Sequence, residues 1–332
     1  MRIGKITENV LKRSIWKIAR KTYTDNSAEG YTDCAVFATD NNSTNICSSI
    51  ATWTLDIENA GKYAVVNAVN NLAAAGADVK ELMISIVMPE DAEEKKLRQI
   101  MEDAANAAVY FGAEIKSGQT EVSPAVKNCI ITVSAVGEKI NSENKDTEIK
   151  PQKGDAIIMT KWIGLSGSAI LADEGRDVID KHYPPFIRNA GVSFGKLEYL
   201  EVVKDAEIAK RCRAKVMHDV SFGGIFASLW ELGQMTGHGF DVYLNRIPIR
   251  QETVEMTDIL NVNPYQMTSQ GALLFVTSNA DKALEEFEKE GINAQVIGYL
   301  KNTNDKVIYN DEEKRFLDLP QTDSIVAYKY SR

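Results

Sequence analysis

The sequence predicts an α/β protein made of two domains, and three observations carry this prediction. A chain of 332 residues is longer than one ordinary hydrophobic core requires. Apolar runs of strand length alternate along it with amphipathic stretches of helical period. The segment 141–153 (NSENKDTEIKPQK) is polar throughout and contains a proline, which is typical of a linker. We therefore expect domains at residues 1–140 and 154–332, joined by residues 141–153.

The sequence of the first half predicts two helices among five strands. A helix is expected from Gly61 to about Ala77, because its apolar residues recur at helical spacing and Gly76 can adopt the left-handed conformation that ends a helix. Pro89-Glu90-Asp91 opens a second helix, where early acidic residues suit the helix dipole. The expected strands of this half are residues 34–38, 45–53, 82–88, 113–116 and 128–136.

The second half predicts a further set of strands and helices. Apolar runs there are short, and helical periods follow several of them. The expected strands are residues 156–160, 214–217, 240–244, 272–277 and 294–300, and the expected helices are 166–174, 223–234 and 281–290, with a less patterned helical region reaching residue 210. This order of elements favours a second α/β layer structure.

Composition excludes several classes of protein. The chain is 44% hydrophobic and 26% charged, as soluble globular proteins are. Its 38 Lys+Arg against 47 Asp+Glu give a net charge of −9, which disfavours nucleic acid or an anionic membrane as a partner. The first residues lack an apolar signal core, and no run approaches the roughly 20 apolar residues of a membrane span. We expect a cytoplasmic protein.

The four cysteines predict no metal or redox site. Cys34, Cys47, Cys129 and Cys212 lie far apart in sequence, and none forms a C-x-x-C pair. We expect them to be buried free thiols.

The helix predicted after Gly61 is unusual because it combines asparagines with small apolar residues. Asn67, Asn70 and Asn71 share one helical face, and the alanines around them allow a ligand or another backbone to come close. Buried amides require hydrogen-bond partners. This face is therefore a candidate binding surface.

Glycines stand beside polar residues near the ends of predicted strands, most clearly in the segment 218–224 (HDVSFGG). On a functional interpretation, Ser221 caps the next helix, Gly223 and Gly224 offer free N–H groups to an anion, and Asp219 binds a metal or a ribose. On a structural one, Ser221 is only a helix cap and Asp219 hydrogen-bonds a turn. His218 is likewise a candidate acid/base or a packed histidine.

Two further polar residues can also be interpreted either as functional or as structural residues. Lys161 follows a predicted strand and is either a phosphate contact or a surface lysine. Glu121, in the segment 117–121, is most simply a solvated loop carboxylate. No G-x-x-x-x-G-K-[ST], nucleophile elbow or HExxH pattern is present.

The order of these segments is more specific than any one of them. The chain resembles the aminoimidazole ribonucleotide synthetase (PurM-like) superfamily and, within it, the HypE-like hydrogenase maturation factors. The segments that carry the resemblance are GKITENVLKRS (4–14), DCAV (33–36), GKYAVVNAVNNLAAAGA (61–77), GQTEV (118–122), TKWIGLSGSAILA (160–172), MHDVSFGGIFASLWEL (217–232), IPIRQETVE (247–255) and NPYQMTSQGALL (263–274).

The resemblance implies a two-domain fold and a nucleotide site. An N-terminal mixed sheet would form a barrel across a homodimer, and a C-terminal α/β sandwich would pack beside it. Family members bind ATP and use Mg²⁺ to phosphorylate an amide-type oxygen. The implied cofactor-binding residues are Asp33, Asn70, Asn71, Thr120, Glu121, Lys161 and Asp219, with Asp33 and Glu121 as metal ligands and Lys161, Asp219 and His218 as catalytic candidates.

The sequence departs from the family pattern at acidic positions. Asn71 stands where a metal-binding aspartate is usual, Gln119 replaces a histidine or aspartate, and Ala51 lies where Thr-Asp or Thr-Asn is expected. Phe222 replaces a glutamate. Each loss of a carboxylate weakens a site for a hard cation, so binding of Mg²⁺ is put in question.

Two hypotheses of function follow. One is an ATP-dependent, HypE-like enzyme that activates an amide on a small molecule or on a protein partner. The other is a catalytically silent homologue that keeps the dimeric fold as a nucleotide-binding or regulatory module. No cysteine follows Cys212, so we expect no modification of a terminal cysteine of the kind the resemblance implies for HypE.

Overall fold

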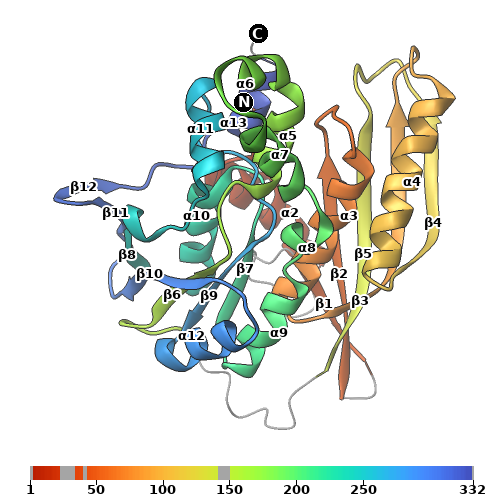
Figure 1. The fold of residues 1–332 in the computed structure, drawn as a ribbon. Coiled ribbons are helices and arrows are strands. Elements are labelled where there is room, and N and C mark those ends of the chain that lie inside the picture. The colour runs from red at the N-terminus through yellow and green to blue at the C-terminus, as the bar shows by residue number, and fades with distance from the viewer. Residues whose placement is uncertain (1–2, 23–33, 40–42, 141–149, 331–332) are drawn as a thin grey trace.

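The fold consists of two β-sheets that stand side by side with helices between and around them (Figure 1). The computed structural model describes residues 3–22, 34–39, 43–140 and 150–330. The mixed α/β fold predicted from the sequence is confirmed. The expected domain limits at 140 and 154 stay a prediction, since most of the linker between them lies outside the described residues.

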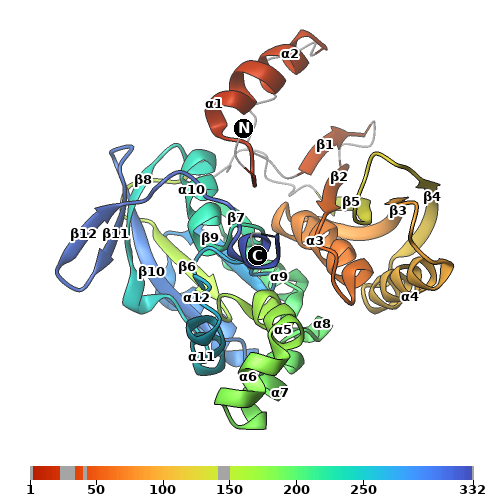
Figure 2. The same ribbon diagram turned by 90° about the horizontal axis from the view of Figure 1, so that it is seen from above.

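The first sheet has five strands in the order β1-β2-β5-β3-β4. They are β1 (Cys34–Ala38), β2 (Thr44–Trp53), β3 (Asp78–Met88), β4 (Glu114–Val122) and β5 (Ile130–Ile140). Neighbouring strands are antiparallel except β3 and β4, which are parallel. One face is covered by α3 (Ala60–Ala74) and α4 (Glu94–Tyr110), whereas no described helix or strand covers the other (Figure 2). We call the uncovered side the outer sheet face.

Helix α3 lies between the two halves of the molecule (Figure 2). It is buried on almost every side, which explains a composition of small and apolar residues all round the helix. Gly61 is required there because a Cβ at this position would lie 2.0 Å from the carbonyl oxygen of Ile100 in α4. Gly76 has φ +81° just after the helix, as the sequence predicts.

The second sheet has seven strands in the order β12-β11-β8-β10-β6-β9-β7. They are β6 (Ala156–Thr160), β7 (Val216–Val220), β8 (Gly239–Tyr243), β9 (Ala272–Thr277), β10 (Ala294–Lys301), β11 (Lys306–Asn310) and β12 (Glu313–Phe316). Its helices are α5 (Leu165–Glu174), α6 (Arg176–His182), α7 (Pro185–Phe194), α8 (Leu197–Leu200), α9 (Val203–Arg211), α10 (Gly224–Thr236), α11 (Gln251–Ile259), α12 (Ala280–Lys289) and α13 (Ser324–Tyr330).

Alternation along the strands gives the second sheet two apolar faces. Leu274 and Val276 of β9 pack with α10, whereas Leu273 and Phe275 pack with α9 and α12. A third cluster runs from the first sheet through α3 to α5 and α11, so the two halves share one hydrophobic core.

The start of the described chain contacts the segment that precedes α13. The N-terminal arm comprises α1 (Glu8–Leu11), η1 (Lys12–Trp16), α2 (Lys17–Ala19) and η2 (Arg20–Thr22), and it projects away from both sheets (Figure 2). The hydroxyl of Thr322 donates to the carbonyl oxygen of Ile3 at 2.6 Å. Among the helices of the described ranges, none is both long and apolar enough to cross a bilayer.

Candidate functional site

Asn71 and Asp219 meet where α3 packs against β7. The amide of Asn71 is oriented so that its nitrogen faces acceptors and its oxygen faces donors. In this orientation Nδ2 donates to Asp219 Oδ1 at 3.0 Å and to the carbonyl oxygen of Asn67 at 3.3 Å. Asp219 is only 1% exposed, so this carboxylate sits deep in the junction between the halves. The structure thus brings together two residues that are 148 positions apart and that the sequence singled out separately.

Both polar atoms of the Asn70 amide form hydrogen bonds with the second half of the chain. Its Nδ2 donates to the carbonyl oxygen of Leu200 at 2.9 Å, and its Oδ1 accepts from the N–H of Val202 at 3.1 Å. The side chain is fully buried. Asn70 therefore ties α3 to the segment between α8 and α9, and its predicted role as a nucleotide contact stays a prediction.

Lys161 is buried rather than exposed, so the interpretation as a surface lysine is wrong. Its Nζ lies 3.0 Å from Asp205 Oδ2 and also donates to the carbonyl oxygen of Glu201. Lys161 has φ +52°, and its backbone is held by Asn293 on both sides. Burial raises the pKa of Glu201, an effect that the nearby Lys161 reduces. A phosphate contact by Lys161 would require the ion pair with Asp205 to open.

His218 lies on the opposite face of the second sheet from Asp219. Successive residues of a strand point to opposite faces, and Asp219 faces α3 while His218 faces α10. His218 Nε2 is 3.0 Å from Glu231 Oε2, and Lys5 Nζ contacts the same carboxylate group at 2.7 Å. His218 is thus separated from the Asn71–Asp219 pair.

Thr120 and Glu121 lie in β4, at the far edge of the first sheet. The segment 117–121 is part of this strand, so the expectation of a short strand followed by a loop is wrong. In the register of β4 with β3, Gln119 pairs with Ser85 and Glu121 with Val87, which directs Gln119 and Glu121 to the outer sheet face. Within one chain, three strands separate β4 from β1. Asp33, the remaining predicted ligand, lies outside the described residues.

Aromatic side chains fill the junction beside the Asn71–Asp219 pair. Trp53 at the end of β2 stacks on Tyr63 of α3 with ring centroids 5.3 Å apart, and the ring centroid of Phe222 lies 4.9 Å from that of Trp53. Ala51, two residues before Trp53, is buried in the same core. The positions of Ala51 and Phe222, where the sequence departs from the resembled pattern, therefore belong to an apolar contact between the two halves.

The N-terminus of α10 is capped by a residue that the sequence did not indicate. Asp323 Oδ2 accepts from the N–H of Gly223 at 2.7 Å, and its Oδ1 accepts from the N–H of Ile325 at 2.8 Å. Ser221 uses its backbone carbonyl oxygen, which accepts from Gly224, so the predicted side-chain cap is wrong. Burial raises the pKa of Asp323 to about 6, and backbone N–H donors partly offset this increase. Asp323 lies 100 residues from Gly223 in the sequence, so only the fold reveals its contact with α10.

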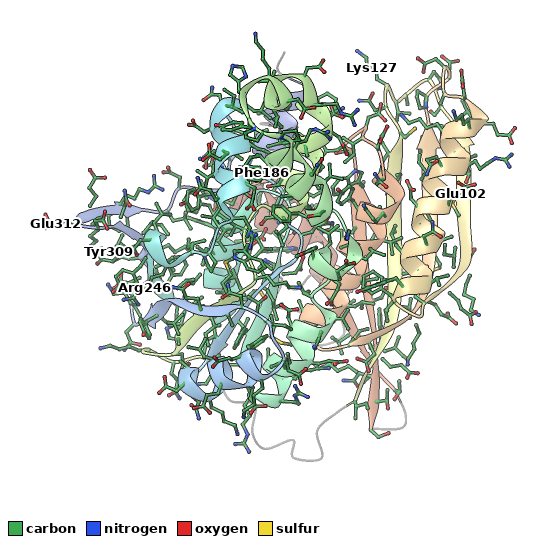
Figure 3. The ribbon with its side chains drawn as sticks, in the orientation of Figure 1. Glu102, Lys127, Phe186, Arg246, Tyr309 and Glu312 are labelled. Carbon is green, nitrogen blue, oxygen red and sulfur yellow. The ribbon has the colours of Figure 1, made fainter. Side chains whose placement is uncertain are left out.

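A cavity of about 1020 Å³ opens at one end of the first sheet, where Lys127 lies (Figure 3). Its charged lining is mostly acidic: Asp56, Glu58, Asp91, Glu93, Asp103 and Glu174 against Lys95, Lys96 and Lys127. Carboxylates at this density repel a triphosphate. The cavity is therefore a poor candidate for the nucleotide site.

Comparison with protein families decides the classification. The model of the AIR synthase related protein N-terminal domain matches residues 28–139, and that of the C-terminal domain matches residues 152–310. The chain belongs to the AIR synthase related protein family. The predicted PurM-like, HypE-type resemblance is confirmed.

Individual relatives of this AIR synthase related protein agree with the classification. Carbamoyl dehydratase HypE of Rhodobacter capsulatus is 29% identical over 245 residues, covering 72% of this chain and 68% of the relative. Among solved structures, a HypE–HypF complex has a chain of the same fold, with a TM-score of 0.72, 20% identity and coverage of 92% and 98%. HypE in complex with ATP gives a TM-score of 0.64 at 20% identity, with coverage of 82% and 84%.

The described residues of this AIR synthase related protein do not fit a Mg²⁺ ion. Within them, no three His, Cys, Asp or Glu side chains are grouped as metal ligands would be. At the junction, the amide of Asn71 donates to Asp219 Oδ1, where a metal-binding aspartate would instead add a second carboxylate.

The buried Asp323 predicts a specific pH dependence of stability. Its pKa is about 6 in the folded protein and 3.8 as the ordinary value, so the folded state binds the proton more tightly. The stability from this protonation is complete below pH 3.8 and is lost as the pH rises through 6. The loss amounts to about 3 kcal/mol.

The measurement is the free energy of urea unfolding between pH 4 and 8 for the parent protein and Asp323→Asn. Other carboxylates titrate equally in both, so the difference isolates Asp323. We expect the parent to lose stability relative to the variant as the pH rises. Parallel curves would contradict the prediction.

Proposed function

We propose that this protein binds ATP and uses it to activate an amide-type oxygen for dehydration. The observation that carries the proposal is the match of both halves to the AIR synthase related family, together with the 29% identity to a relative named carbamoyl dehydratase. The shared fold with HypE in complex with ATP supports ATP as the nucleotide. ATP binding by this chain, the acceptor and the partner belong to the proposal.

The proposed chemistry begins with attack of the amide oxygen on the γ-phosphorus of ATP, which releases ADP. Loss of one proton from nitrogen leaves an O-phosphorylated imidate. The oxygen then departs as phosphate, and loss of the second proton from nitrogen completes the dehydration. Positioning and charge stabilisation dominate such phosphoryl transfers. Asp219 supplies a carboxylate oriented by Asn71, and Lys161 supplies a cationic donor once its pair with Asp205 opens.

We propose that the amide is carried by a small molecule or by a protein partner, rather than by a cysteine of this chain. All four cysteines are buried and free, as the sequence predicts. Burial raises the pKa of Cys47, Cys129 and Cys212, which keeps these thiols neutral and unreactive. The fold shared with a chain of a HypE–HypF complex supports delivery by a partner.

The outer sheet face supports the predicted homodimer. Apolar side chains on this face are left exposed: Phe37, Ile50, Met83 and Ile140. Ile50, Thr52, Gln119 and Glu121 belong to this face by strand alternation. Pairing of two such faces would cover the apolar residues and place Glu121 of β4 inside the assembly. A second copy is therefore the proposed partner for this face.

Thermal melting with nucleotides tests the proposed function. A ligand that binds only the folded protein at a hundred times its Kd stabilises it by about 2.7 kcal/mol. We expect ATP at millimolar concentration to raise the Tm of the parent protein, and Asp219→Asn to reduce this shift. Asp241→Asn is the matched control, since Asp241 pairs with Lys301 at the surface.

Phosphate release completes the test. We expect ADP and phosphate when ATP is combined with a peptide that carries a carbamoylated cysteine. No melting shift with ATP would contradict nucleotide binding. A shift without phosphate release would instead identify a nucleotide-binding homologue that lacks catalysis.

A further inference from the structure

A second cavity adjoins the acidic cavity at the end of the first sheet. It has a volume of about 320 Å³ and shares Ile57, Glu58 and Glu174 with the larger one, of about 1020 Å³. Tyr63 of α3 and Asp173 of α5 also line it. We call the smaller space the Tyr63 cavity. The two adjoining cavities form one acidic region, which the proposed nucleotide chemistry does not use.

Negative charge is poorly balanced in this region. Burial raises the pKa of Asp173, Glu58 adds to this increase, and two arginines and a lysine do not cancel it. Burial also raises the pKa of Asp103, which lines the larger cavity, and Glu58 again contributes. Among the described residues that line the Tyr63 cavity there is no lysine or arginine. The region therefore favours a positively charged ligand.

The last turn of α5 adds to the negative potential. Asp173 and Glu174 end this ten-residue helix, and no basic residue lies in its last turn. The aligned peptide dipoles give a helix C-terminus a partial negative charge, which favours cations. Lys329 pairs with Glu174 at 2.8 Å, but no described residue forms an ion pair with Asp173. Asp173 is thus a carboxylate whose charge a ligand can compensate.

The hydroxyl of Tyr63 points independently to a ligand. Tyr63 is 3% exposed, and its ring stacks on Trp53. Burial raises the pKa of Tyr63 and Asp173 raises it further, so the hydroxyl stays protonated and lies near Asp173. No described residue accepts from this hydroxyl or donates to it. A buried polar group without a partner costs free energy, so the hydroxyl suits a ligand that brings a hydrogen-bond donor.

Neither Lys62 nor a metal ion meets this need. Nζ of Lys62 donates to the carbonyl oxygen of Gly195 at 2.7 Å and lies 4.8 Å from the centroid of the Tyr63 ring. Burial lowers the pKa of Lys62, although Asp103 and Asp173 partly restore it. Within the described ranges, no three side chains that could ligate a metal are grouped closely enough to hold one. The carboxylates are instead spread along two cavities, which suits a ligand whose positive charges are also spread.

We propose that the two cavities bind an organic polycation, with one ammonium group in the Tyr63 cavity between Asp173 and the Tyr63 hydroxyl and the others along the carboxylates of the larger cavity. A free polyamine and a lysine-rich protein segment share this chemistry. Each ammonium group has three N–H donors, so one group can contact a carboxylate oxygen and the Tyr63 oxygen together. Asp91, Glu93 and Asp103 of the larger cavity are available to the remaining groups.

Calorimetric titration of spermidine into the full-length chain at low ionic strength tests the proposal. The variant Tyr63→Phe removes the hydroxyl and keeps the stacked ring and the net charge. We expect it to weaken spermidine binding about tenfold, since a hydrogen bond to a charged donor is lost. Asp173→Asn should weaken binding about fivefold, because ion pairs of exposed carboxylates are worth less. Asp177→Asn, an exposed carboxylate of α6, is the matched control and should leave the affinity unchanged.

Methyl NMR of the parent protein gives a second measurement that needs no variant. Ile57 and Ile170 line the Tyr63 cavity, whereas Ile225 lies in the apolar core of the second sheet. We expect spermidine to shift the δ1 methyl signals of Ile57 and Ile170 and to leave that of Ile225 unchanged. Propylamine, which carries one ammonium group, should produce the same shifts only at a concentration about tenfold higher.

Spermidine binding that is equal in the parent and in a folded Tyr63→Phe protein would overturn the proposal. Equal losses in Asp173→Asn and Asp177→Asn, absence of binding, or displacement of spermidine by equimolar Mg²⁺ would overturn it as well. A blocked trilysine peptide identifies the source of the polycation. Tighter binding of the peptide than of spermidine supports the site with a protein segment as its ligand, and the reverse order supports it with a free polyamine.

Discussion

Replacing Asn71 with aspartate is expected to lower the free energy of unfolding by about 3–5 kcal/mol when divalent cations are absent. The amide of Asn71 donates to Asp219 Oδ1 at 3.0 Å, and Asp219 is 1% exposed. The variant would place a half-buried carboxylate at position 71 in contact with the buried carboxylate of Asp219, so one must take up a proton or remain as a poorly compensated charge. Urea unfolding at pH 7.5 with a chelator measures the loss.

Addition of Mg²⁺ is expected to restore much of this stability in Asn71→Asp and to change the parent little. Two carboxylates at one site are ligands that a hard cation prefers. The control is Asn71→Leu, which removes the amide donor at similar volume without adding charge. Equal losses in both variants, with no response of Asn71→Asp to Mg²⁺, would show that the contact with Asp219 does not govern metal binding.

Replacing Ile50 with aspartate is expected to convert a dimer into monomers at micromolar concentration. Ile50 is 71% exposed in one chain and points from β2 to the outer sheet face. In the proposed dimer this side chain becomes buried, and an unpaired buried charge would cost several kcal/mol, or a factor of about 1000 in the dimer dissociation constant. Light scattering of the parent and the variant measures the change in mass.

The matched control for Ile50→Asp is Val109→Asp. Val109 is 78% exposed on α4, the helix that carries Glu102 and covers the opposite face of the sheet (Figure 3). We expect this variant to keep the mass of the parent. A monomeric parent, or loss of the dimer in both variants, would rule out the outer sheet face as the interface.

Local patterns in the sequence were sufficient to predict most strands and helices. Helix α3 and its end at Gly76 follow from helical period and one glycine, and the strand 156–160 follows from a short apolar run. The segment 117–121 was misjudged because a strand at the edge of a sheet, exposed along most of its length, lacks the apolar pattern that marks a buried one. Pairing with β3, which sequence does not show, makes it a strand.

The candidate site was only partly predictable, because its contacts join residues that are distant in sequence. The asparagine face of α3 was visible from its period, but the partners of Asn70 and Asn71 lie about 130 to 150 positions further along the chain. For Lys161 the sequence leaves a phosphate contact and a surface lysine both open, and only its pairing with Asp205 explains its burial. The roles of these residues in binding stay predictions.

The position of α3 restricts how the molecule can move. Helix α3 packs on the first sheet, and its Asn70 hydrogen-bonds to the backbone of Leu200 and Val202 in the second half. The two halves therefore cannot separate without breaking buried hydrogen bonds. A ligand must then reach the junction without separation of the two halves. Helix α3 thus joins the two halves into one rigid unit.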